Sequence, residues 1–197
     1  MWYWIFRFFF RGIFKLFFKL KVEGLENIPW KTNFIIVANH NSFLDSVLIM
    51  SAVPKKIYCI ALRDIYKFQW LGWFLRLIET VPSGNSSEKA VNILLENKNV
   101  GLFPEGGVSR DGKLKEFRRG SALLSFKTGR PIVPCAIIGT FESLPFGSRI
   151  PKIRPLKLKI GKPIFLGREF DHYIEDSLLQ EGIFKVRNTI KGMLDDG

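Results

Sequence analysis

Residues 34–45 read FIIVANHNSFLD, and this stretch decides the predicted fold. The first five residues form a continuous apolar run of strand length, which is typical of a strand buried on both faces of a sheet. Polar residues then interrupt the run, and a helix is predicted over residues 43–51. A buried strand that leads through a short turn into a helix is the basic unit of a parallel α/β sheet.

The alternation of apolar strands and amphipathic helices continues along the chain. Further strands are predicted at 57–62, 100–103, 132–138 and 156–160, and further helices at 87–96 and 120–128. Strand 156–160 is more polar than the others and is expected at an edge of the sheet. The tail is predicted to be an amphipathic helix, with Glu175 and Asp176 near its start and apolar positions spaced by four and three: Leu179, Ile183, Val186, Ile190 and Met193. We therefore expect an α/β domain over residues 26–197, with a mostly parallel central sheet flanked by helices.

The first 25 residues are predicted to form a separate membrane-anchoring helix. Residues 1–21 hold ten of the 28 aromatic residues and no acidic residue. On a helix, residues four apart form a tilted stripe, so the four cations Arg7, Arg11, Lys15 and Lys19 would lie beside a face that includes Trp2 and Trp4. The apolar runs are too short to span a bilayer, so this helix is expected to lie in the interface of an anionic membrane.

This segment has two other interpretations. The helix could pack its aromatic face on the domain itself, in which case the cations would merely be solvated. A secretory signal is disfavoured, because the apolar core is interrupted and no small-residue cleavage site precedes Lys21. The expected location is the cytoplasmic face of the membrane, as a peripheral or monotopic protein.

The composition narrows the class of partner. A formal net charge of +12 and a pI near 9.9 indicate an anionic partner. Nucleic acid is disfavoured, because no nucleic-acid motif occurs and the N-terminal cations and aromatics share an amphipathic helix. Cys59 and Cys135 lie in apolar stretches and are predicted to be buried, reduced thiols. Neither has a second cysteine or a histidine at metal-ligand spacing, and no metal is expected.

The chain has two histidines, and His40 is the better candidate for a general base. It follows a buried strand, where open α/β sheets place their sites, whereas His172 lies in a charged stretch and is expected on the surface. Asp45 follows five residues after His40 and could fix the ring's tautomer and stabilise the imidazolium. Ser42 and Asp45 also match a helix capping box, so the spacing leaves both roles open.

A second group of candidate residues follows strand 100–103. Proline ends the strand, and the glycines of Phe103-Pro104-Glu105-Gly106-Gly107 allow a backbone to approach a ligand closely. Glu105 could orient a hydroxyl or a water, although an ordinary acidic turn fits as well. Cations follow downstream, at Arg110, Lys113, Lys115, Arg118 and Arg119.

These motifs together resemble the glycerolipid acyltransferase family, and most closely its bacterial 1-acylglycerol-3-phosphate acyltransferases. The resemblance rests on Asn39-His40-x4-Asp45, Phe103-Pro104-Glu105-Gly106, Ser109-Arg110-Asp111-Gly112 and Gly129-Arg130-Pro131-Ile132-Val133-Pro134, in matching order over residues 34–140. It implies that His40, oriented by Asp45, deprotonates a lipid hydroxyl, which attacks the thioester of acyl carrier protein or coenzyme A. No resident cofactor is implied. The same resemblance assigns acceptor binding to Glu105, Gly106 and Gly107, and we expect Phe103, Pro104 and Arg110 to contact the substrate as well. It also implies that the product is phosphatidic acid, in a step of phospholipid synthesis.

The sequence departs from the family pattern at two expected phosphate-binding arginines. Val108 occupies one of those positions, and residues 81–85 lack the other. Either Arg110, Arg76 or Arg63 has taken over the phosphate, or the acceptor is another lyso-lipid, such as a lysophospholipid or an amino-acid lyso-lipid. A non-catalytic lipid-binding protein on the same fold is a further alternative.

Overall fold

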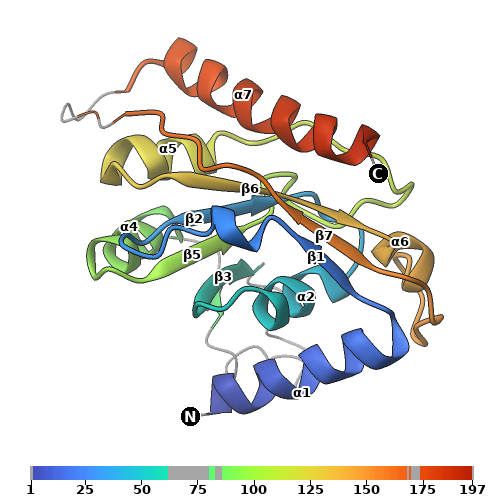
Figure 1. Ribbon diagram of the computed structural model, residues 1–197. Coiled ribbons are helices and arrows are strands. Elements are labelled where there is room, and N and C mark those ends of the chain that lie inside the picture. Colours follow the sequence, from blue (N-terminus) through green and yellow to red (C-terminus); the bar gives the residue numbers. More distant parts are fainter. Residues whose placement is uncertain (1, 62–79, 83–85, 168, 170–173, 197) are drawn as a thin grey trace.

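The computed structural model describes residues 2–61, 80–82, 86–167, 169 and 174–196. In this part of the chain a central sheet separates two groups of helices, with α5 (Gly120–Thr128) and α7 (Asp176–Asp195) on one side (Figure 1). On the other side lie α1 (Trp2–Phe17) and α2 (Leu44–Ala52). The remaining helices are α4 (Ser86–Leu95), the short α6 (Thr140–Ser143) and a 3-10 turn at Leu25–Asn27.

The sheet of the described residues has the strand order β1-β7-β6-β2-β5-β3-β4. All neighbouring pairs are parallel except β6 and β7, which confirms the predicted mostly parallel α/β sheet flanked by helices. The strands are β1 (Lys21–Glu23), β2 (Ile35–Ala38), β3 (Ile57–Ala61), β4 (Val81–Pro82), β5 (Asn99–Leu102), β6 (Ile132–Ile138) and β7 (Lys157–Ile160).

The predicted edge position of strand 156–160 is wrong. β7 lies between β6 and β1, and β1 occupies the edge. The polar character of β7 comes from Lys157 and Lys159, which alternate with the fully buried Leu158 and Ile160. β1 itself is only three residues long, too short for a periodic pattern. It belongs to the 1–25 segment, so that segment contributes a strand to the sheet as well as a helix.

The continuous apolar run of β2 fills both faces of the sheet, as predicted. Ile36 and Ala38 join the core beneath α1 and α2, whereas Ile35 and Val37 join the core formed with α4, α5 and α7. Because both faces are covered by helices, every position of β2 is buried. This central strand therefore fixes the position of the residues that follow it.

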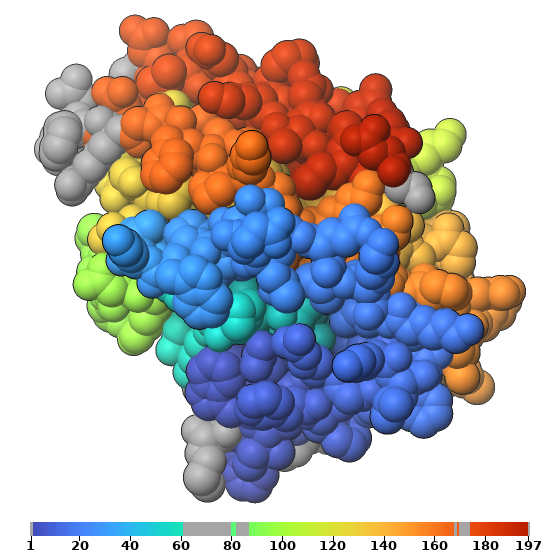
Figure 2. Space-filling model, in the orientation of Figure 1, coloured from blue at the N-terminus to red at the C-terminus, as the bar shows by residue number. Residues whose placement is uncertain are grey.

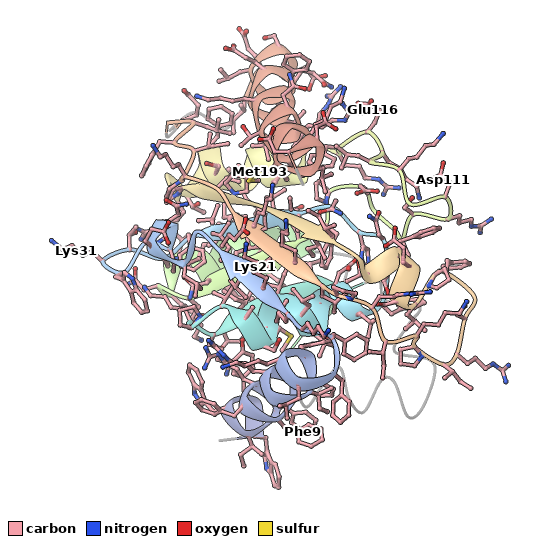
Figure 3. All side chains as sticks on the ribbon, turned by 45° about the vertical axis from the view of Figure 1, so that its right-hand side comes forward. Phe9, Lys21, Lys31, Asp111, Glu116 and Met193 are labelled. Atoms are coloured by element: carbon pink, nitrogen blue, oxygen red, sulfur yellow. The ribbon has the colours of Figure 1, made fainter. Side chains whose placement is uncertain are left out.

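The N-terminal helix α1 packs against α2, and its other side is exposed among the described residues. Tyr3 and Phe14 are buried, and the Tyr3 hydroxyl accepts a hydrogen bond from the Ile57 N–H at 3.0 Å. The outer side exposes a group of large apolar residues: Trp2, Trp4, Ile5, Phe8, Phe9, Leu16 and Phe17. Figure 2 shows α1 forming the lower surface of the molecule, and Figure 3 shows Phe9 on the side away from the sheet.

The expectation that Arg7 belongs to a membrane-facing cationic stripe is wrong. Its side chain is only 8% exposed, and Nε donates to the Val53 carbonyl at 3.0 Å. This bond gives a hydrogen-bond partner to a carbonyl at the C-terminal end of α2. Burial lowers the pKa of Arg7. Arg11, Lys15 and Lys19 remain exposed. The part of the chain that the structure describes contains no helix long and apolar enough to cross a bilayer.

Candidate active site

His40 lies in the turn that joins β2 to α2, and the turn is fixed to the neighbouring strand. The buried Asn39 side chain donates to the Ile137 carbonyl at 2.9 Å and accepts from the Ile137 N–H at 2.8 Å. These two bonds hold the start of the turn to β6. The position of His40 is therefore set by the sheet itself.

Asp45 contacts both the ring of His40 and the backbone of the turn. Its Oδ2 lies 2.9 Å from His40 Nδ1 and accepts from the N–H groups of Asn41 and Ser42 at 2.7 and 2.8 Å. The two roles that the sequence left open therefore coexist in one fully buried carboxylate. Because the carboxylate accepts, a proton lies on Nδ1, and in the neutral imidazole Nε2 then keeps its lone pair.

The imidazole of His40 is held on its face as well as at its edge. The Phe103 ring stacks on it with a centroid distance of 4.0 Å and an interplanar angle of 16°. The side chain is 14% exposed. With Nδ1 occupied by Asp45, this arrangement suits Nε2 for taking a proton from a bound hydroxyl.

Glu105 contacts the backbone of His40. Its Oε1 accepts from the His40 N–H at 2.9 Å, and the Ser109 N–H donates to the His40 carbonyl at 2.7 Å. The loop after β5 therefore holds both backbone groups of the candidate base. Burial raises the pKa of Glu105, and the nearby N–H groups of His40 and Lys115 partly oppose that rise.

The positive φ of Gly106 favours glycine in the Pro-Glu-Gly turn, and a cation packs against this residue. Gly106 has φ of +73°, and a Cβ there would lie 2.5 Å from the Arg118 guanidinium carbon. Gly107 has open space where a Cβ would be. The Arg118 N–H donates to the Pro104 carbonyl at 2.8 Å, so residues 113–118 fold back onto the loop.

A second cation contacts the same loop at Val108. The Lys115 ammonium donates to the Val108 carbonyl at 3.0 Å, while the Lys115 carbonyl accepts from Arg187 of α7 at 3.1 Å. Both Lys115 and Arg118 are exposed to solvent. In the sequence they are two of several cations downstream of the loop, and only the folded loop distinguishes them from their neighbours.

Arg110, predicted to bind substrate, is exposed and lies over the ring of Phe146, 5.1 Å from its centroid. Arg63, Arg76, His172 and residues 83–85 lie outside the described residues. Cys59 and Cys135 are buried free thiols, as predicted, and burial raises the pKa of each to about 12. Within the described ranges, no three metal-ligating side chains are grouped to hold an ion.

The sequence of this chain matches a known protein family. The family model described as "Acyltransferase" matches residues 19–138. The chain belongs to the acyltransferase family. A crystal structure of the 1-acyl-sn-glycerophosphate acyltransferase PlsC from Thermotoga maritima is similar to 98% of this acyltransferase-family chain, with a TM-score of 0.78 and 30% sequence identity, and 79% of that chain is covered.

Proteins with similar sequences are named as acyltransferases too. A chloroplastic 1-acyl-sn-glycerol-3-phosphate acyltransferase of Arabidopsis thaliana is 32% identical over 158 residues, which are 75% of this chain and 44% of that protein. The 1-acyl-sn-glycerol-3-phosphate acyltransferase of Borreliella burgdorferi is 27% identical over 192 residues, covering 88% of this chain and 73% of that one. The chain thus spans about half the length of the plant relatives that it matches.

Proposed function

We propose that this protein transfers a fatty acyl group from an acyl thioester to the free hydroxyl of a 1-acylglycerol-3-phosphate, giving phosphatidic acid. The observation that carries the proposal is the 2.9 Å contact between His40 Nδ1 and Asp45 Oδ2. It leaves Nε2 as the free basic atom of the ring. The names of the relatives support the acceptor, since they specify 1-acyl-sn-glycerol-3-phosphate.

The reaction needs one proton to move twice. His40 Nε2 takes the proton of the acceptor hydroxyl while its oxygen attacks the thioester carbonyl carbon. The resulting tetrahedral intermediate collapses, the C–S bond breaks, and the imidazolium returns the proton to the leaving thiolate. Asp45 stabilises the charged ring throughout. General base catalysis of this kind contributes roughly 10²- to 10⁴-fold.

The acceptor is proposed to bind along the loop after β5. Glu105 holds the loop to the backbone of His40, and Gly107 leaves room beside it. We assign the acceptor phosphate to Lys115 and Arg118, the two exposed cations that contact this loop. They supply positive charge where the side chain of Val108 supplies none, and charge-assisted bonds to phosphate are strong.

The protein is proposed to work as a peripheral protein on the cytoplasmic face of an anionic membrane. The exposed apolar side of α1 would enter the interface, with Trp2 and Trp4 among its aromatics. Arg11, Lys15 and Lys19 would contact the headgroups. The acyl donor is proposed to be a thioester of acyl carrier protein or coenzyme A. Because the side chain of Val108 cannot bind a phosphate, an acceptor with a different headgroup is the alternative.

The proposal is tested by acyl transfer in anionic vesicles. Labelled acyl thioester is supplied with lysophosphatidate or, in parallel, with zwitterionic and uncharged lyso-lipids. We expect transfer to lysophosphatidate to be the fastest. Transfer to another acceptor alone would show that the acceptor is misassigned, and no transfer to any acceptor by a folded protein would favour a binding role.

Replacing Lys115 with methionine should raise KM for lysophosphatidate about 10-fold or more and change kcat little. A hydrogen bond to a charged group contributes about 1.5 to 3 kcal/mol, and the phosphate would lose one such partner. Initial rates over a range of acceptor concentrations measure both constants. Lys113→Met is the matched control, because Lys113 is an exposed cation of the same segment. Equal KM values for the two variants would remove Lys115 from the phosphate site.

A further inference from the structure

The loop between α6 and β7 combines exposed apolar and basic side chains. We call residues 144–155 the 144–155 loop; it contains no acidic residue. Phe146, Ile150 and Ile153 are 47%, 81% and 64% exposed. The cations Arg149, Lys152 and Arg154 alternate with them. Apolar side chains this exposed are costly in water unless a surface covers them.

The base of the 144–155 loop is fixed to the domain. The Lys152 N–H donates to the Ser143 carbonyl at 2.7 Å, which closes the loop near its start. At its end the Pro155 carbonyl packs against Gly139, where a Cβ would lie only 2.2 Å away. Gly139 has φ of +89°, so only glycine suits this position. The exposed apolar residues therefore project from an anchored base.

The 144–155 loop lies beside the C-terminal end of α1. The N–H of Leu156, directly after the loop, donates to the Phe18 carbonyl at 2.9 Å, and the Lys21 N–H donates to the Leu156 carbonyl at 2.9 Å. Figure 1 shows the loop and this end of α1 at the same corner of the molecule. The loop that carries these exposed apolar residues thus ends beside the C-terminal end of α1.

The same loop borders the candidate active site. The Ser42 hydroxyl donates to the Leu144 carbonyl at 2.7 Å, and Ser42 lies in the turn that carries His40. The ring of Phe146 lies 6.2 Å from that of Phe43 and beneath the Arg110 guanidinium. The loop therefore connects the end of α1 to the catalytic turn.

We propose that the 144–155 loop is a second membrane-contact element, which binds an anionic bilayer together with α1 and places the His40 site beside the lipid surface. Interleaved cations and apolar residues suit a lipid interface, because the cations meet headgroups while the apolar side chains enter the acyl boundary. An acidic carrier protein would be attracted by the cations alone. The high exposure of Ile150 and Ile153, and the position of the loop's end beside α1, favour the bilayer. The inference deepens the proposed function at a membrane and rests on it.

An environment-sensitive fluorophore on Ile150→Cys tests the contact directly. Both native cysteines are buried, so the introduced thiol is the accessible target among the described residues. On equimolar phosphatidylglycerol and phosphatidylcholine vesicles we expect a blue shift, and quenching by lipids with a spin label in the acyl chain. Phe184→Cys is the matched control, since Phe184 is equally apolar, 65% exposed and on α7, across the sheet from α1. Its label should respond to neither.

Partitioning gives a second readout that needs no turnover. Changing Arg149, Lys152 and Arg154 together to glutamine should weaken binding to the anionic vesicles at least tenfold and change binding to phosphatidylcholine vesicles little. Labels at 150 and 184 that respond alike to vesicles would overturn the proposal. A label at 150 that responds to an acyl carrier protein and not to vesicles would also overturn it and identify a carrier-docking surface. Vesicle binding without acyl transfer would instead count against the proposed function alone.

Discussion

Replacing His40 with alanine should lower kcat/KM for acyl transfer by a factor of about 10³ to 10⁴, because the proposed general base is lost. Some stability should also be lost, since the variant lacks the stacking contact with Phe103 and the bond to Asp45. Asp45 would keep its two backbone donors, Asn41 and Ser42. Initial rates in anionic vesicles, with thermal melting and vesicle sedimentation alongside, measure all three properties.

His172→Ala is the matched control for that variant, because it removes the other histidine of the chain. It should retain the activity of the unaltered protein. If His40→Ala transferred acyl groups at the unaltered rate while remaining folded and bound to vesicles, His40 would not be the base. If both histidine variants lost activity equally, the assignment to His40 alone would be wrong.

Replacing Asp45 with asparagine should lower kcat/KM by about 10² to 10³, less than the loss expected for His40→Ala. An amide cannot provide the negative charge that stabilises the imidazolium, and its NH₂ group can force the ring into the wrong tautomer. The change also places a buried NH₂ group near two N–H donors, which should cost about 1 to 3 kcal/mol in the free energy of unfolding. Urea unfolding and initial rates separate the two effects.

The contrast between capping and catalysis makes the Asp45 variant informative. The amide oxygen of asparagine can still accept the N–H groups of Asn41 and Ser42, so a purely structural Asp45 would leave the rate per folded molecule unchanged. A rate near that of the unaltered protein, measured on folded variant, would therefore show that Asp45 only holds the turn. A large loss of kcat with an intact fold would support its role on the ring.

The features predicted from sequence were those set by local pattern. The apolar run of β2 predicted a doubly buried strand, and α5 and β6 begin and end where their patterns predicted. His40 and Asp45 are close because they share one turn between a strand and a helix. Their contact is therefore local in the chain. The five-residue spacing indicated it, and the structure shows it.

The features that escaped prediction depend on partners distant in the chain. β1 exists because β7 pairs with it, and Arg7 is buried because the carbonyl of Val53 needs a donor. Lys115 contacts Val108 because Arg187 of α7 and the turn at Pro104 fold its segment back. The sequence of one segment does not show which distant segments it contacts, so Lys115 could not be distinguished from Lys113.

The most direct test of His40-assisted attack by the acceptor is the release of thiol from the acyl donor, followed before and after lysophosphatidate is added. Both described cysteines are buried, with thiol pKa values raised to about 12, so neither suits a covalent acyl-enzyme. We expect no burst of thiol before the acceptor is added and, afterwards, one thiol released for each phosphatidic acid formed. A burst equal to the amount of protein before the acceptor is added, or no release after it, would contradict direct attack by the acceptor hydroxyl.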